Sequence, residues 1–148
     1  IDSADRHLKE GEQISVGNLQ ISVIATPGHT PNCLTYHCAD RLFTGDCLLI
    51  GDCGNLCDNG ADAGQLYDSI TRKLLRFADE TLLYPGHFQQ GRQVSCIGDE
   101  RRNNPLFCGV SRDEFIARIA SRPCQISAHN IENAAANRRC GLPLSKIN

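Results

Sequence analysis

Three apolar runs in this chain end on a glycine, and the residue after each glycine is a histidine or an aspartate. The stretches TPGH, TGD and YPGH place His29, Asp46 and His87 in this position. Glycine at the end of a strand lets the backbone turn sharply, so the next side chain can point across the sheet edge. If the three strands are neighbours, the three side chains converge. Two imidazoles and a carboxylate suit zinc, iron or manganese, and an open coordination position would make the site catalytic.

Each of these residues also has a simpler interpretation. A lone histidine after Pro-Gly is more often a solvated turn residue, and Asp46 can cap a turn. Their joint occurrence at three strand ends strengthens the case for a metal site and leaves both interpretations open. The other histidines give no such signal, because His37 alternates with strand residues while His7 and His129 lie in polar surroundings. We expect those three histidines to be structural or exposed.

The strand-like runs pair into hairpins near the start of the chain. Residues 12–28 alternate apolar and polar side chains on both sides of Gly17-Asn18, which is typical of a β-hairpin. Residues 33–38 and 41–46 are β-rich and are separated only by Ala39-Asp40, which predicts a second hairpin. Glycines and short polar residues over 48–62 predict an irregular loop.

Helical signals follow in the second half. Apolar residues recur at helical spacing from Asp62 to about Ala78, with Asp62 as the expected N-cap. A short apolar run that ends in YPGH predicts one more strand. Ser111 and Glu114 have the spacing of a capping box at the start of another helix. The expected fold is α/β in class.

Length and composition limit the classes of function. The chain has 148 residues, 41% of them hydrophobic, which fits one domain over residues 1–148. A net charge of -2, without long runs of one sign, points to neither a nucleic-acid partner nor a membrane partner. The sequence shows no apolar stretch of ~20 residues and no signal-peptide core. We therefore expect a cytoplasmic protein, with the mitochondrial matrix as the alternative.

Nine cysteines are many for a chain of this kind. Their odd number and the lack of a secretory signal favour free thiols over a disulfide framework. The spacing of Cys53 and Cys57 in CGNLC resembles half of a zinc site, but no second pair lies at matching spacing. The cysteines are Cys33, Cys38, Cys47, Cys53, Cys57, Cys96, Cys108, Cys124 and Cys140.

Several motifs together resemble a known superfamily. The segments ADRHLKEGEQISVGNLQISVIATPGHT, LFTGDCLL, LLYPGH and GDERRNNP look like the C-terminal portion of a metallo-β-lactamase-fold protein. GQLYDSI and ANRRCG favour the persulfide dioxygenase branch, which is similar to glyoxalase II. The resemblance implies an αβ/βα sandwich that is incomplete at the N-terminus. The chain also begins with Ile1 and has no methionine, which is typical of a fragment or a processed chain.

The resemblance also implies a chemistry. His29 and Asp46 would bind a metal. His87 would either bind a second metal or contact the ligands of the first metal without binding it. In a persulfide dioxygenase the metal is Fe(II), held by two histidines and a carboxylate, and the enzyme is an oxidoreductase of sulfur metabolism that converts glutathione persulfide to sulfite and glutathione. In glyoxalase II two metals, with zinc as the alternative to iron, make a hydroxide that attacks a thioester. The expected partner is a small-molecule thiol or persulfide.

The sequence departs from the family pattern in ways that bear on activity. The HxHxDH motif, which holds the family's first ligands, is absent from these 148 residues. We therefore expect the chain alone to be inactive and to associate with itself or with an upstream segment of the same protein. A third interpretation is a non-catalytic fragment.

Two further departures concern the substrate. After Cys53-Gly54 the dioxygenases usually have Arg-Thr-Asp, where this chain has Asn55, Leu56 and Cys57. The loss of the guanidinium removes a bidentate clamp for a carboxylate. After YPGH they usually have Asp-Tyr, where this chain has Phe88 and Gln89.

Overall fold

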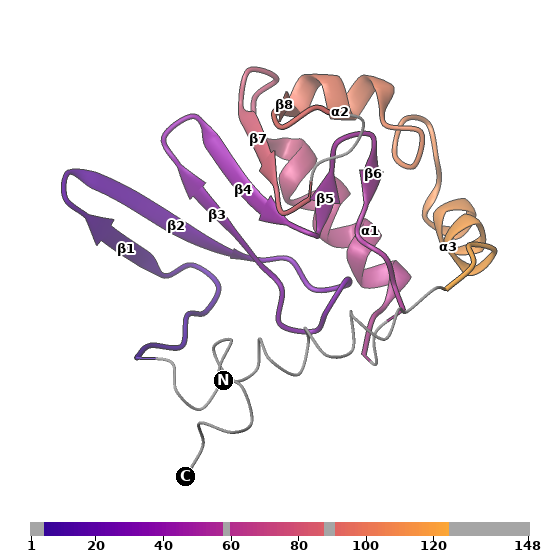
Figure 1. Ribbon diagram of the computed structural model, residues 1–148, viewed down its shortest axis with the longest axis horizontal. Helices are drawn as coiled ribbons and strands as arrows, with labels where there is room; N and C mark the ends of the chain where they lie inside the picture. Colours follow the sequence, from indigo (N-terminus) through magenta and orange to yellow (C-terminus); the bar gives the residue numbers. More distant parts are fainter. Residues whose placement is uncertain (1–4, 58–59, 88–90, 125–148) are drawn as a thin grey trace, which may run out of the picture.

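The computed structural model describes residues 5–57, 60–87 and 91–124, and its main feature is a six-stranded sheet of order β1-β2-β3-β4-β7-β8 (Figure 1). Two further short strands, β5 and β6, pair with each other. The strands are β1 (Gln13–Val16), β2 (Leu19–Ala25), β3 (Leu34–Cys38), β4 (Arg41–Gly45), β5 (Leu48–Leu49), β6 (Asp52–Cys53), β7 (Leu82–Pro85) and β8 (Ser95–Cys96).

Both predicted hairpins are confirmed. Strands β1 and β2 pair antiparallel around Gly17-Asn18, and Gly17 has a φ of 59°, which glycine adopts without the steric cost of a Cβ. Strands β3 and β4 pair antiparallel around Ala39-Asp40. The predicted loop over 48–62 is only partly correct, because β5 and β6 form within it. Their turn contains Gly51, and the apolar pair Leu48–Leu49 is buried.

Strand direction explains why the predicted site residues share one edge of the sheet. β2 and β4 are both antiparallel to β3, which lies between them, so β2 and β4 run in the same direction. β7 pairs parallel with β4. The carboxyl ends of β2, β4 and β7 therefore meet at the same edge.

The helices are α1 (Ala63–Arg72), α2 (Ile97–Asn103) and α3 (Arg112–Ala120), with a short 3-10 helix η1 (Leu74–Arg76) after α1. Asp62 caps α1 as predicted, since its side chain accepts a hydrogen bond from the Gln65 amide. The capping box of Ser111 and Glu114 begins α3. The predicted first helix is shorter than expected, because α1 ends at Arg72 and η1 follows. Neither β8 nor α2 was predicted as a separate element.

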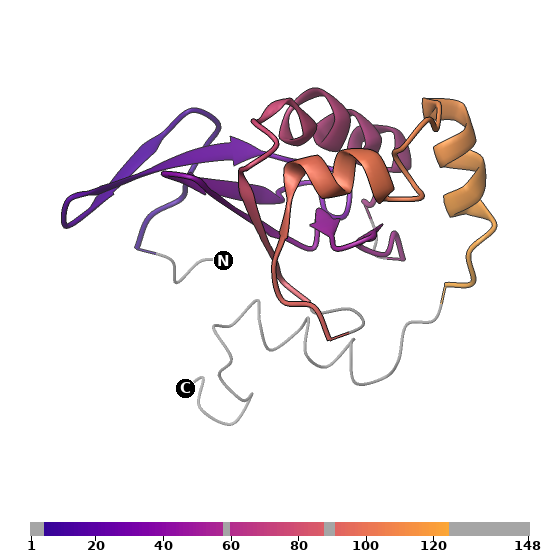
Figure 2. The ribbon, with the colours of Figure 1, turned by 90° about the horizontal axis from the view of Figure 1, so that it is seen from above.

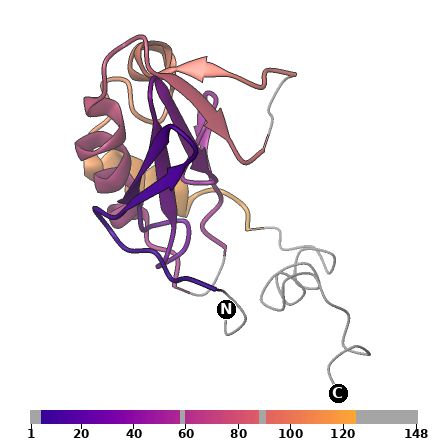
Figure 3. The ribbon, with the colours of Figure 1, turned by 90° about the vertical axis from the view of Figure 1, so that its left-hand side faces the viewer.

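The hydrophobic core lies between the sheet and the helices, and Figures 2 and 3 show α1 and α3 on the same side of the sheet. Leu42 and Leu83 face each other in register on β4 and β7, and both are fully buried. Leu66 of α1 and Phe115 of α3 are also fully buried in the same cluster. This packing confirms the α/β class and fixes α1 behind the edge that carries the predicted ligands.

The opposite face of the sheet carries a row of aromatic side chains. Tyr36, Phe43 and Tyr84 are in register on β3, β4 and β7, so they project from one face. The rings of Phe43 and Tyr84 stack with centroids 5.4 Å apart, and Phe43 is 42% exposed. The core side chain Leu42 precedes Phe43 in β4, and strand alternation therefore places Phe43 away from the helices.

Within residues 5–57, 60–87 and 91–124, no helix has the length and apolar character required to cross a membrane.

Candidate metal centre

The parallel pairing of β4 and β7 places Asp46 beside His87. Gly45 is opposite Pro85 in the register, and the Gly86 amide donates a hydrogen bond of 2.8 Å to the Gly45 carbonyl. An alanine Cβ at position 86 would lie 2.7 Å from Asp46 Oδ1, closer than a carbon and an oxygen can approach. Glycine at this position therefore lets the His87 backbone approach the aspartate.

The loop that carries His29 is held against α1. An added Cβ at Gly28 would lie 2.3 Å from the Leu66 Cα, and the φ of Gly28 is 144°, so both packing and conformation require glycine here. The Gly28 carbonyl accepts a hydrogen bond of 2.8 Å from the Asp62 amide at the start of α1. Ser69 Oγ donates to the Pro27 carbonyl at 2.7 Å. Helix α1 thus fixes the position of the His29 backbone.

The structure brings all three predicted ligands together around the Asp46 carboxylate. His87 Nδ1 lies 2.6 Å from Asp46 Oδ1, and His29 Nε2 lies 3.7 Å from Asp46 Oδ2. The His29 side chain is 14% exposed, that of Asp46 27%, and that of His87 75%. The site is therefore enclosed on the His29 side and open to solvent on the His87 side.

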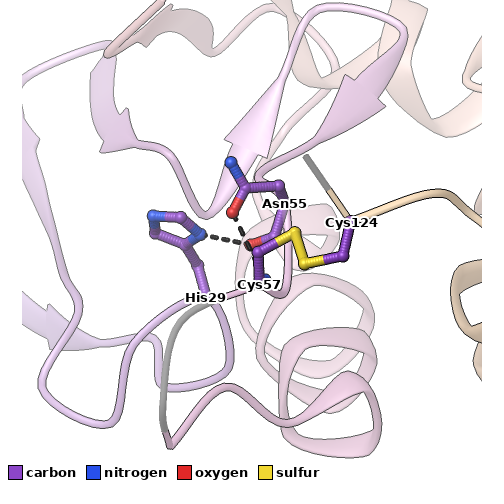
Figure 4. The surroundings of a disulfide bond; sticks show 4 residues. All are labelled: His29, Asn55, Cys57 and Cys124. Carbon is purple, nitrogen blue, oxygen red and sulfur yellow. Dashed lines mark hydrogen bonds between the residues drawn. A yellow bond between two sulfur atoms is a disulfide. The ribbon is translucent and has the colours of Figure 1, made fainter. Parts of the chain in front are cut away.

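Hydrogen bonds determine which histidine nitrogen is available. His29 Nδ1 lies 2.5 Å from the Asn55 carbonyl oxygen, which only accepts, so Nδ1 carries the proton and donates (Figure 4). The lone pair of neutral His29 is then on Nε2, the nitrogen that faces Asp46. His87 Nδ1 donates to the carboxylate of Asp46 in the same way, which leaves Nε2 of His87 towards the exposed side.

The donors match one side of a metal site. Two ligand atoms that share an ion at ~2.0–2.2 Å are about 2.8–3.6 Å apart, depending on the coordination angle. The 3.7 Å between His29 Nε2 and Asp46 Oδ2 is only slightly longer, so a small side-chain rotation would let both atoms bind one ion. Among the residues that the structure describes, no group of three or more His, Cys, Asp or Glu side chains has the arrangement of a metal site. His29 and Asp46 thus fit the chemistry of a metal, and His87 contacts the carboxylate instead of completing a set of three.

A disulfide next to this site corrects the expectation that all cysteines are reduced. Cys57 and Cys124 are bonded to each other, with Cα atoms 5.5 Å apart (Figure 4). This bond also excludes the CGNLC zinc half-site, because Cys57 is occupied and Cys53 is buried. The other cysteines of the described residues are free, and Cys140 lies outside them. The free cysteines are Cys33, Cys38, Cys47, Cys53, Cys96 and Cys108.

Burial controls the chemistry of two of the free thiols. Burial raises the pKa of the Cys47 thiol to about 12, and it raises the pKa of Cys53 to the same value. The thiolate, which is the form that binds metals and reacts, is therefore disfavoured at both positions. Cys47 follows Asp46 directly, yet it belongs to the core cluster.

The remaining predicted positions have simple outcomes. The His37 ring packs against Phe77 with centroids 4.7 Å apart, which confirms a structural role. His7 is exposed, as expected. The predictions for His129, and the substitutions at Phe88 and Gln89, fall on residues outside those that the structure describes.

Sequence reasoning missed two residues that shape the site. Asn55 acts through its backbone carbonyl, so its side-chain type gave no signal. An added Cβ at Gly54 would lie 2.1 Å from the Asp46 carbonyl oxygen and 2.9 Å from His29 Nδ1. The glycine was the available signal, because glycine often marks a close approach of two backbone segments. The pattern alone did not say what it approaches.

Comparison with known proteins agrees with this fold. The family model described as the metallo-beta-lactamase superfamily matches residues 2–87. The crystal structure of ETHE1 from Myxococcus xanthus has a TM-score of 0.87 and 41% identity, covering 95% of this chain and 63% of that chain. Persulfide dioxygenase ETHE1, mitochondrial, of Homo sapiens is 35% identical over an alignment of 145 residues, and the match covers 94% of this chain and 55% of the human protein.

A hydrolase is also similar over a shorter stretch. Hydroxyacylglutathione hydrolase of Hamiltonella defensa is 46% identical over 80 residues, covering 54% of this chain and 31% of the hydrolase. The chain spans about half the length of the persulfide dioxygenase that it matches. The family match extends over more than half of the chain and ends at His87, so it includes all three residues around the Asp46 carboxylate. The chain belongs to the metallo-beta-lactamase superfamily.

Proposed function

We propose that this chain contributes to the metal centre of an enzyme that oxidises a glutathione persulfide-like substrate to sulfite with dioxygen. The observation that carries the proposal is the pair His29 and Asp46, whose donor atoms face each other while the Asn55 carbonyl holds the proton on the far imidazole nitrogen. Similarity to persulfide dioxygenase over 94% of the chain supports this substrate class.

In this proposal the metal is Fe(II), with zinc as the alternative, and His29 Nε2 and Asp46 Oδ2 hold it. Iron would supply open positions where dioxygen and the substrate sulfur bind. The overall reaction takes one persulfide, one dioxygen and one water to one thiol, one sulfite dianion and two protons.

The chain's own residues orient the ligands. The Asn55 carbonyl keeps the proton on His29 Nδ1, so that Nε2 presents a lone pair. His87 donates to Asp46 Oδ1 and thereby turns Oδ2 towards His29. With 75% of its side chain exposed, His87 also lies on the side from which a substrate approaches. Its second nitrogen is placed to donate or accept a proton at that opening.

A thioester hydrolase of the glyoxalase II type is the second candidate. The 46% identity to hydroxyacylglutathione hydrolase over 80 residues favours it, and the same three residues would serve that reaction. Asn55, Leu56 and Cys57 carry no guanidinium for a carboxylate of the substrate. The two candidates therefore differ in the reaction at the metal, and this loop does not distinguish between them.

The experiment compares the two reactions directly. The metal-loaded chain, with and without an added HxHxDH-bearing segment, is supplied with glutathione persulfide in an oxygen electrode and with S-lactoylglutathione in a hydrolysis assay. With the added segment present, we expect persulfide-dependent oxygen uptake that is lost in His29→Ala and kept in the control His7→Ala, whose histidine is exposed. Thioester hydrolysis without oxygen uptake would favour the second candidate. Oxygen uptake that survives His29→Ala would contradict the proposed site.

A further inference from the structure

We propose that the Cys57–Cys124 disulfide positions His29 for metal binding, so that reduction of this pair weakens the metal site. The inference rests on the proposed metal centre, and it adds a dependence of metal affinity on the redox state of two thiols. It starts from two contacts between residues 54–57, which lead to Cys57, and the site, and from one contact that anchors the segment of Cys124.

The first contact is the hydrogen bond that sets the state of His29. His29 Nδ1 donates to the Asn55 carbonyl at 2.5 Å, and Cys57 is only two residues further along the chain. Figure 4 shows the His29 ring directed at Asn55 with the disulfide on the other side of the loop. Within residues 54–57, the described hydrogen bond is weak, since the Cys57 amide lies 3.4 Å from Asn55 Oδ1. The covalent bond is therefore the strongest restraint at this end of the loop.

The second contact is the close approach of Gly54. Its backbone lies so near the site that an added Cβ would be 2.1 Å from the Asp46 carbonyl oxygen and 2.9 Å from His29 Nδ1. A loop at such a distance transmits its own displacement to both predicted ligands. A shift of ~1 Å at Asn55 would be enough to break the bond to His29, because hydrogen bonds weaken steeply beyond about 3.2 Å.

The third contact anchors the other half of the disulfide. Cys124 follows α3, which is fixed to the core through the fully buried Phe115. Arg122 donates to Asp52 Oδ1 at 2.8 Å, so the segment after α3 also contacts β6, the strand that leads into residues 54–57. The disulfide thus connects residues 54–57, which contact His29, to a rigid part of the molecule.

The bond is also accessible to reductants. Cys57 is half-buried and Cys124 is exposed. A small-molecule dithiol reduces the pair by thiolate attack on one sulfur, which releases the other as a thiolate. The second thiol of the reductant then displaces the remaining cysteine. Two electrons pass from the dithiol to the protein disulfide, and the products are a cyclic disulfide and two cysteine thiols.

The test measures metal affinity against redox state in the full 148-residue chain. Co(II) is titrated against a competing chelator into oxidised protein, into protein reduced and then desalted anaerobically, and into the double variant Cys57→Ser/Cys124→Ser. The matched control is Cys108→Ser, which removes an exposed free cysteine. Loss of an outer contact to a metal ligand typically weakens metal binding ~10- to 100-fold, and we expect this loss for the reduced protein and the double variant only.

A second readout separates this inference from the proposed function. In metal-free protein, NMR detects the proton on His29 Nδ1 through its bond to Asn55, and circular dichroism checks that the double variant is folded. We expect this resonance in oxidised protein and its loss after reduction. If oxidised protein binds no Co(II), the proposed function fails and the resonance alone decides the inference. Equal affinity together with an unchanged resonance in both redox states overturns the inference, as does peptide mapping that finds Cys57 and Cys124 unlinked.

Discussion

Gly86 illustrates how much of the site depends on single residues that have no side chain. A Cβ added at Gly86 would lie 2.7 Å from Asp46 Oδ1, so any other residue here would push the carboxylate away. The carboxylate of Asp46 is held there by His87 Nδ1. The geometry around the carboxylate therefore depends on glycine at this position.

We predict that Gly86→Ala weakens metal binding about tenfold or more, because the carboxylate must move away from the new methyl group and lose its bond to His87. The measurement is Co(II) affinity by chelator competition. The control is Gly11→Ala, where an added Cβ meets nothing within 4 Å and the positive φ costs stability without reaching the site. Equal affinity in Gly86→Ala and the parent protein would contradict this placement of Asp46.

Thiol reactivity provides a second test at the residue scale. The pKa values of Cys47 and Cys53 are raised to about 12 by burial, so both thiols stay protonated as pH rises through the neutral range. At pH 8 a thiol with such a pKa is thiolate in only about one molecule in 10⁴. We predict that iodoacetamide labels the exposed Cys108 in native protein, while Cys47 and Cys53 react only after denaturation. Peptide mass spectrometry measures the rates, and similar rates for all three would be inconsistent with the core.

At the scale of elements, the sequence predicted what periodicity and capping encode. Both hairpins, the N-cap at Asp62 and the capping box at Ser111 were found because alternation and polar cap residues are local signals. The two-residue strands β5, β6 and β8 are too short to show a period. The Cys57–Cys124 bond joins residues 67 positions apart, and cysteine spacing cannot determine such a pairing.

The same limits apply to the candidate site. The convergence of three side chains was predictable, because each follows a strand-ending glycine and their strands share a direction. The orientation of each imidazole was not predictable from residue types. It depends on the Asn55 carbonyl for His29 and on Asp46 Oδ1 for His87, and both contacts arise only after the loops have folded.

A buried carboxylate connects three elements whose pairing the sequence did not reveal. Glu100 of α2 is 2% exposed and accepts hydrogen bonds from the Gly51 amide at 2.8 Å, Ser95 Oγ at 2.6 Å and Asn104 Nδ2 at 2.9 Å. It thereby holds the β5–β6 turn and β8 against α2.

We predict that Glu100→Ala lowers the free energy of unfolding by at least about 3 kcal/mol, because each of the three donors loses its partner in a buried place. Urea denaturation gives the change. The control Glu80→Ala removes an exposed carboxylate and should stay within about 0.5 kcal/mol of the parent protein. A cost for Glu100→Ala as small as for the control would show that this network does not support the fold.

At the scale of the whole molecule, the helices cover one face of the sheet and the aromatic row of Tyr36, Phe43 and Tyr84 lies on the other. The predicted metal ligands lie along one edge between these faces. The similar human protein is nearly twice as long as the matched region, and the 148 residues here contain no HxHxDH motif. The number of metal ligands on this chain therefore limits the metal affinity and the activity that we expect of it in isolation.

We predict little or no persulfide oxidation by the 148-residue chain by itself. Iron in a site of two histidines and one carboxylate needs three protein ligands, while the described residues place no third His, Cys, Asp or Glu ligand beside His29 and Asp46 in the arrangement of a metal site. An added HxHxDH-bearing segment should first strengthen the weak iron binding and then allow turnover, as measured by iron content and oxygen uptake. Full turnover in the isolated chain would mean that another of its residues completes the site.

Anaerobic titration of Fe(II) into the full chain tests whether His29 and Asp46 bind a metal ion. We predict one ion per chain, with affinity lowered at least about tenfold in His29→Ala and in Asp46→Ala, because each variant removes a direct ligand. The control His7→Ala should bind iron as the parent protein does. Equal iron binding by all four proteins, or none by the parent chain, would contradict the claim.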